Sequence, residues 1–205
     1  MARAGAVKAR TQAGNQLRDL ILTAPEQVRR PLAGLPCQRQ VDVAARFRPH
    51  DLTGPAEGAK AAMASVARRH QQLAAEIARL DAALEELLTR AAPPEFLAKQ
   101  GVATQVGATL LATTGDNPGR LRTEASFAAL CGASPVDASS GKQRRHRLNR
   151  GGDRQANSAL WRIVFTRMAC DPRTQAYVAR RTADSKTRKE IIRCLIGALS
   201  VPRSG

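Results

Sequence analysis

The stretch MASVARRHQQLAAEIARLDAALEEL, residues 63–87, carries the clearest structural pattern in the chain. Its seam residues recur at alternating spacings of three and four: Met63, Val66, His70, Leu73, Ile77, Leu80, Leu84 and Leu87. This is the heptad repeat of a coiled coil, and the charged residues lie off the seam. The pattern predicts a long helix that pairs with another helix. Its partner comes either from a second subunit or from residues 2–22, a predicted helix that could fold back against it.

Prolines punctuate the chain on both sides of this helix. Five prolines within residues 25–56 predict short helical pieces and loops, and Pro93-Pro94 ends the long helix. We therefore divide the chain into residues 1–56, a linker with a first helix, residues 57–92, the coiled-coil helix, and residues 93–205, a small helical domain. Further helices are expected at 104–114, 124–130, 153–169, 173–181 and around 191–199, and no strand pattern is convincing. The fold class is predicted to be all-α.

The start of the third segment has the layout of a helix-hairpin-helix. A short helix near Phe96, a turn at Gly101 and a second helix to Thr114 follow one another. Backbone amides in such a hairpin bind a phosphate group. The usual hairpin has two glycines, and Ala103 stands at the second position here. Gly101 is the candidate phosphate-binding residue of this element.

Charge is unevenly distributed along the chain. The whole sequence has a formal net charge of +16 and a pI near 11.3. Residues 142–205 hold sixteen lysines and arginines against four acids, so most of the excess lies in the last third. Such a field predicts a polyanionic partner, and nucleic acid is favoured because Gly, Asn, Gln and Ser interleave the basic run. No apolar run is long enough to cross a membrane, and a membrane surface is disfavoured as a partner.

Few residues have the pattern of a catalytic site. Ser139-Ser140-Gly141 immediately precedes a basic run, and arginines could hold a phosphate near a serine hydroxyl. On spacing alone, a solvated loop is the favoured explanation of this stretch. Acids are too scattered for a metal site, and His70 is interpreted as a packing residue. Four separated cysteines argue against a zinc ribbon or disulfide scaffold and predict a reducing cytoplasm.

Two blocks of the sequence resemble a known family. FAALCGASPVDASSGKQRRHRLNRGGDRQANSAL, residues 127–160, and DPRTQAYVARRTADSKTRKEIIRCL, residues 171–195, closely resemble the C-terminal domain of bacterial insertion-sequence transposases of the IS-one-ten (IS110) type. These enzymes are related to the Piv DNA invertases. LRDLILTAPEQVRRPLAGL, residues 17–35, and GVATQVGATLLATTGDNPGRLRTEASFAAL, residues 101–130, resemble their actinobacterial branch. The resemblance covers about residues 2–195.

The resemblance implies a function in transposition of an insertion sequence, a mobile DNA element. Family members combine a RuvC-like domain, whose four acids bind Mg²⁺, a coiled coil that joins subunits, and a domain whose serine attacks a DNA phosphate. A structured noncoding bridge RNA is expected to guide them. Carried over to this chain, the nucleophile is Ser140, with Ser139 as the near alternative. The implied DNA- or RNA-binding residues are Gly141, Lys142, Arg144, Arg145, Arg147, Asn149, Arg150 and Arg154.

Two departures from the family pattern qualify these expectations. No residue matches the four acids, so we expect no metal site in this chain and interpret residues 1–56 as a residual linker and helix after a missing RuvC-like domain. After Leu195 the sequence also leaves the family's register. Both departures suggest a truncated transposase that is inactive alone, bound to the bacterial nucleoid and paired through residues 63–87. The alternatives are a non-catalytic, dimerising fragment that inhibits full-length transposase, and a basic nucleoid protein without sequence preference.

Overall fold

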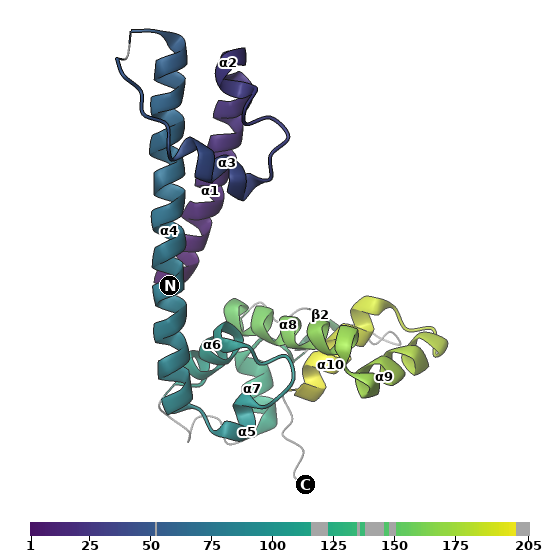
Figure 1. Cartoon of the computed structure of the whole chain (residues 1–205). Helices are drawn as coiled ribbons and strands as arrows, with labels where there is room; N and C mark the ends of the chain where they lie inside the picture. Colours follow the sequence, from purple (N-terminus) through teal and green to yellow (C-terminus); the bar gives the residue numbers. More distant parts are fainter. Residues whose placement is uncertain (52, 116–122, 135, 138–145, 148–150, 200–205) are drawn as a thin grey trace. The chain divides into compact units, whose positions relative to one another are not determined.

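The structure, a computed structural model, describes the chain except for residues 52, 116–122, 135, 138–145, 148–150 and 200–205. Ten helices account for most of the described residues (Figure 1). Two compact units follow one another, Met1–Ala83 and Leu84–Gly205, which we call unit 1 and unit 2. The all-α prediction is confirmed, as is a long helix followed by smaller helices. The division at 56 and 92 stays a sequence-based one.

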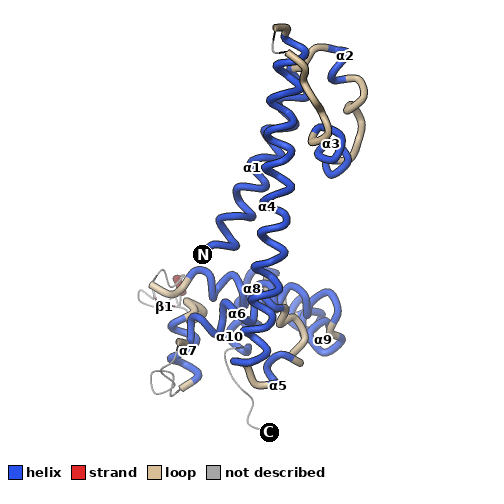
Figure 2. The backbone as a smooth tube through the Cα atoms, turned by 60° about the vertical axis from the view of Figure 1, so that its left-hand side comes forward, coloured by secondary structure: helices blue, strands red, loops and turns tan. Residues whose placement is uncertain are grey.

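The long helix α4 (Pro55–Ala91) begins at a proline and contains the whole heptad seam. In unit 1, helix α1 (Ala2–Thr23) lies alongside it in both views (Figures 1 and 2). The guanidinium of Arg3 pairs with the carboxylate of Asp81, and Gly14 lies under His70. The seam is therefore covered, over much of its unit 1 portion, by the first helix of the same chain. This is one of the two pairings that the sequence left open.

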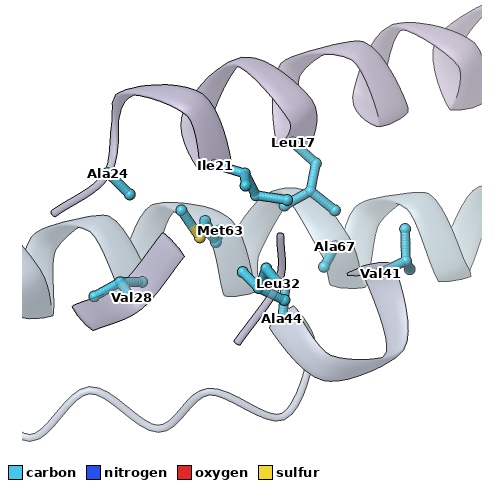
Figure 3. Close-up of a cluster of buried hydrophobic side chains, with 9 residues drawn as sticks. All are labelled: Leu17, Ile21, Ala24, Val28, Leu32, Val41, Ala44, Met63 and Ala67. Atoms are coloured by element: carbon cyan, nitrogen blue, oxygen red, sulfur yellow. The ribbon is translucent and has the colours of Figure 1, made fainter. Parts of the chain in front are cut away.

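The core of unit 1 is a cluster of buried hydrophobic side chains (Figure 3). Helices α2 (Glu26–Arg29) and α3 (Cys37–Ala44) supply part of it. Its members come from α1, the proline-rich connection and α4: Leu17, Ile21, Ala24, Val28, Leu32, Val41, Ala44, Met63 and Ala67. Arg68 of α4 holds the connection in place, because its guanidinium donates to the carbonyl oxygens of Ala45 and Phe47, each at 3.3 Å. The predicted short helical pieces between residues 25 and 56 are confirmed.

Unit 2 is organised around helix α8 (Arg154–Cys170), which packs against α6 (Thr104–Thr114), α9 (Pro172–Ala183) and α10 (Arg188–Leu199). The short helix α5 (Pro94–Leu97) precedes α6, and α7 (Glu124–Leu130) follows it. The buried cluster is Val106, Leu110, Cys131, Ala156, Ala159, Leu160, Ile163, Val164 and Ile196. Alanines on α8 let the neighbouring helices approach closely, which suits a chain with few aromatic residues.

Local signals in the sequence explain where the helices of unit 2 begin. The Thr123 hydroxyl accepts from the amide of Ser126 at 3.2 Å, at the start of α7. Before α10, Thr187 and Glu190 form a capping box. The Thr187 amide donates to the Glu190 carboxylate at 2.8 Å, and the Glu190 amide donates to the Thr187 hydroxyl at 3.4 Å. These bonds satisfy backbone donors that the first turn of a helix leaves without a partner.

Candidate nucleic-acid interface

The basic segment, residues 133–152, connects α7 to α8 and contains most of the predicted site. The described residues of this segment include a short strand pair. Strand β1 (Val136–Asp137) is antiparallel to β2 (His146–Arg147), with Val136 opposite Arg147 and Asp137 opposite His146. This short pair was not expected from the sequence. It brings together the residues on either side of the stretch that holds the candidate serines.

Most of the predicted site residues lie outside the described part of the chain. These are Ser139, Ser140, Gly141, Lys142, Arg144, Arg145, Asn149 and Arg150. For Arg147 the structure describes the backbone alone. Arg154 is fully described: its side chain is exposed in the first turn of α8, directly after the basic segment. The roles assigned to all these residues stay predictions.

The two ends of the basic segment are held together by hydrogen bonds to backbone carbonyl oxygens and by a close approach of two glycines. The amide of Asp153 donates to the carbonyl oxygen of Leu130 at 2.7 Å. The side-chain amide of Asn157 donates to the carbonyl oxygen of Cys131 at 3.0 Å. We call these contacts, together with the approach of Gly152 to Gly132, the loop anchor. The anchor fixes where the segment leaves α7 and where it enters α8.

Two glycines make the loop anchor possible. A Cβ atom on Gly152 would lie 2.2 Å from the Gly132 nitrogen and 2.3 Å from its Cα, far inside van der Waals contact. Gly132 itself has φ +64°, a conformation that favours glycine. The contact between Gly132 and Gly152 was not predicted from the sequence. The Gly151-Gly152-Asp153 run before a helix cap was the available signal.

Asp153 caps α8 and joins the anchor to α6. Its carboxylate accepts from the amides of Gln155 at 2.7 Å and Ala156 at 3.2 Å, and from the Thr113 hydroxyl at 3.1 Å. The Ala156 amide is the largest cause of the lowered pKa of Asp153, and the Gln155 and Thr113 donors add to it. Asp153 is therefore a charged structural carboxylate whose oxygens are occupied by protein donors.

Cys131 lies buried at the base of the anchor. Burial, and secondarily the charge of Asp153, raises the pKa of its thiol to about 11. The thiol is consequently protonated at neutral pH, whereas the nucleophilic form of cysteine is the thiolate. Cys131 is thus part of the buried cluster of unit 2 and is a poor candidate for a catalytic nucleophile.

Gly101 occupies the turn between α5 and α6 with φ +90°. A Cβ atom there would lie 3.1 Å from the Cα and 3.2 Å from the carbonyl oxygen of Ile163 on α8. The neighbouring Gln100 carbonyl oxygen accepts from the Arg167 side chain at 2.9 Å. Gly101 therefore has a packing reason to be glycine. The phosphate-binding role and the helix-hairpin-helix assignment stay predictions.

The described acids do not converge on a common point. Among the residues that the structure describes, no group of three His, Cys, Asp or Glu side chains could hold a metal ion. Asp171 and Glu190, like Asp153, accept hydrogen bonds at the start of a helix. The described helices also include none long and apolar enough to span a membrane.

Comparisons with known proteins identify the part of the chain that contains this interface. The family described as "Transposase IS116/IS110/IS902 family" matches residues 96–179. A protein of Streptomyces coelicolor, "Insertion element IS110 uncharacterized 43.6 kDa protein", is 32% identical over 124 residues. That match covers 60% of this chain and 30% of the Streptomyces protein, so the chain spans about a third of the length of this relative. The loop anchor and most of α8 and α9 lie inside the family match.

Proposed function

We propose that this chain binds DNA and acts in the transposition of an insertion sequence, because residues 96–179 match the IS116/IS110/IS902 transposase family. The observation that carries the proposal is the loop anchor. It holds both ends of the basic segment inside the family-matching region. A segment fixed at its ends loses less conformational freedom when it binds a phosphate backbone. DNA binding would also place the protein on the bacterial nucleoid.

The proposed chemistry assigns the attack to Ser140. Its hydroxyl oxygen forms a bond to the phosphorus of a DNA phosphodiester, and the bond from phosphorus to a deoxyribose oxygen breaks. The hydroxyl proton passes to a base, and the released deoxyribose oxygen takes up a proton. Nearby cations offset the charge that develops on the phosphoryl oxygens. The cations proposed for this role are Lys142, Arg144, Arg145, Arg147 and Arg150.

Mg²⁺, which the family resemblance implies, does not fit the described residues. The carboxylates of Asp153, Asp171 and Glu190 are engaged by donors at helix starts, and no acidic cluster is formed in the described ranges. The proposed reaction therefore has no step that uses a metal held by the described residues of this chain. A structured noncoding guide RNA remains part of the proposal as the partner that would select the DNA site.

DNA binding is tested by fluorescence anisotropy with a labelled duplex that carries an insertion-sequence end. Replacing Arg144, Arg145 and Arg147 with glutamine should weaken binding by about 10-fold or more and lower the salt dependence by about one unit per lost phosphate contact. The matched control replaces Arg30, Arg39 and Arg46, which are exposed in unit 1. If both triple variants lose affinity equally, charge acts without a defined site, as in a nucleoid protein.

Catalysis is tested by searching for a covalent protein–DNA adduct on a denaturing gel with Mg²⁺ present. An adduct that disappears in Ser140→Ala and persists in Ser139→Ala supports the assigned nucleophile. The reverse result moves the role to Ser139, and an adduct in both variants excludes both serines. If the wild-type chain binds DNA and forms no adduct, the non-catalytic alternative is favoured.

A specific feature favours that alternative, in which the chain dimerises and inhibits full-length transposase. Leu87, the last residue of the heptad seam, is 60% exposed. Exposed leucine at a seam position is a candidate helix–helix contact. Leu87→Glu should shift sedimentation toward the monomer, whereas Leu22→Glu, at the 64% exposed Leu22 of α1, should not. A wild-type chain that sediments as a monomer would refute pairing through residues 63–87.

A further inference from the structure

Helix α8 exposes two aromatic rings that are not part of the buried cluster of unit 2. Trp161 is 43% exposed and Phe165 is 47% exposed, and their ring centroids lie 5.0 Å apart at an interplanar angle of 15°. We call these two residues the aromatic pair. The opposite face of α8 buries Leu160, Ile163 and Val164. In the described part of the chain, every other aromatic side chain is less exposed than these two.

A cation from a second helix completes the patch. The guanidinium carbon of Arg188, the first residue of α10, lies 5.9 Å from the Phe165 ring centroid. Helix α10 packs against α8, so this contact joins two elements of unit 2 (Figure 1). A cation in the first turn of a helix is disfavoured by the helix dipole. Arg188 therefore gains from the aromatic face, and its charge also remains close to any ligand stacked there.

The surroundings of the aromatic pair are polar and cationic. On the exposed face of α8, the neighbours at helical spacing are Ser158, Arg162, Thr166 and Ala169. No exposed residue of α8 is an aliphatic side chain larger than alanine. The centre of a protein–protein interface is usually apolar and depleted in charge. Flat rings set among arginines are instead the arrangement with which proteins bind unpaired nucleotides.

We propose that the aromatic pair is a stacking site for an unpaired nucleobase of DNA or RNA, with Arg188 beside the adjoining phosphate. This proposal rests on the proposed nucleic-acid function and adds a single-stranded substrate class to it. A base inside a duplex already has both faces stacked, whereas a single strand offers its faces to protein rings. The aromatic pair lies about two to three turns along α8 from Arg154. At 1.5 Å per residue, Trp161 is therefore about 10 Å further along the helix axis than Arg154.

The experiment uses the full chain and its one tryptophan, so that fluorescence reports on Trp161 alone. Oligothymidylate and a mixed-sequence duplex, each carrying a dye for anisotropy, are titrated at one fixed salt concentration. We expect oligothymidylate to quench the tryptophan emission as it binds, and the duplex to quench it much less. Trp161→Ala should weaken oligothymidylate binding by about 10-fold and Phe165→Ala by less. Trp161→Phe, which keeps a ring, should stay within about threefold of wild type.

The controls separate this proposal from the function on which it rests. Leu22→Ala removes an even more exposed hydrophobic side chain from unit 1 and should leave both affinities unchanged. Anisotropy showing duplex binding, with no quenching by bound oligothymidylate and no effect of Trp161→Ala or Trp161→Phe, would overturn the stacking site and leave the proposed function standing. No binding of either probe would overturn both. If the Trp161 and Phe165 variants change the sedimentation coefficient and leave affinity intact, the pair is a protein contact and the proposal is wrong.

Discussion

Unit 1 holds α1 against α4 with buried side chains, whereas unit 2 holds the ends of its basic segment with backbone atoms. In unit 1, Leu17 and Ile21 of α1 meet Met63 of α4 inside an aliphatic cluster. In the loop anchor, Gly152 lies against Gly132 with no room for a Cβ atom. In the first arrangement, a truncated side chain costs stability according to the size of the cavity that it leaves, because the cluster relaxes only partly around it. The second cannot accept an added methyl group without moving the backbone.

The largest effect is expected from Gly152→Ala. The new methyl group would meet the Gly132 backbone at about 2.2 Å, so the anchor must open. We expect a loss of more than about 3 kcal/mol in the free energy of unfolding, with nucleic-acid affinity reduced in parallel. Urea unfolding followed by circular dichroism measures the first quantity, and duplex anisotropy the second.

Gly197→Ala in α10 is the matched control for that substitution. Nothing lies within 4 Å of a Cβ atom at Gly197, and alanine is the better helix former there. It should be neutral or stabilise unit 2 by about 0.5–1 kcal/mol. Equal stability of the Gly152→Ala chain and the wild type would show that the close glycine contact is not required for the anchor.

An intermediate effect is expected in unit 1 from Leu17→Ala. Leu17 is 1% exposed within the aliphatic cluster, and truncation removes its contacts with α4. The loss should be about 3 kcal/mol in the free energy of unfolding, while nucleic-acid affinity measured below the unfolding transition stays unchanged. Leu22→Ala, at an exposed position of the same helix, should change stability by less than about 0.5 kcal/mol. A Leu17→Ala variant that is as stable as Leu22→Ala and the wild type would place α1 away from α4.

The same contrast explains how much of the molecule the sequence could predict. Helix α4 follows from a period of three and four over residues 63–87, and the caps at Thr123, Asp153 and Thr187 follow from side chains within three residues of the groups they bind. These signals are local. The pattern of the seam does not specify its partner, so the choice of α1 over a second subunit was open.

The features that sequence reasoning missed depend on residues distant in the chain. Gly132 and Gly152 are separated by the whole basic segment, and neither has a side chain whose pattern could reveal the contact. The aromatic pair was also overlooked, although Trp161 and Phe165 are large hydrophobic side chains on the exposed side of α8. For the candidate site, the structure gives the anchor and the exposed position of Arg154. Ser140 and its neighbours lie outside the described residues, so their roles rest on the family resemblance.

The smallest expected effect is a difference between the two units in how their stability depends on pH. His70 of unit 1 lies against Gly14, and its Nδ1 atom is buried without a hydrogen-bond partner in the described part of the chain. Burial is the main cause of its lowered pKa, Arg10 lowers it further, and Asp42 opposes the shift. In unit 2, the pKa of Asp153 is also lowered, from 3.8. The neutral form of His70 stabilises unit 1 and the charged form of Asp153 stabilises unit 2. These two forms are therefore lost in different pH ranges.

The direction of each effect depends on whether the folded or the unfolded chain binds the proton at the higher pH. As the pH falls through 6.5, the unfolded chain protonates His70 before the folded one does, so unit 1 is weakened from about pH 7 down to the lowered folded pKa. Asp153 stabilises unit 2 fully above 3.8, and this contribution is lost only as the pH falls through its lower folded pKa. Urea unfolding between pH 7 and pH 5 should therefore show a small loss in wild type that His70→Gln removes. His50→Gln, at an exposed histidine, should retain it, and a flat wild-type profile would show that His70 does not couple protonation to the packing of α1 on α4.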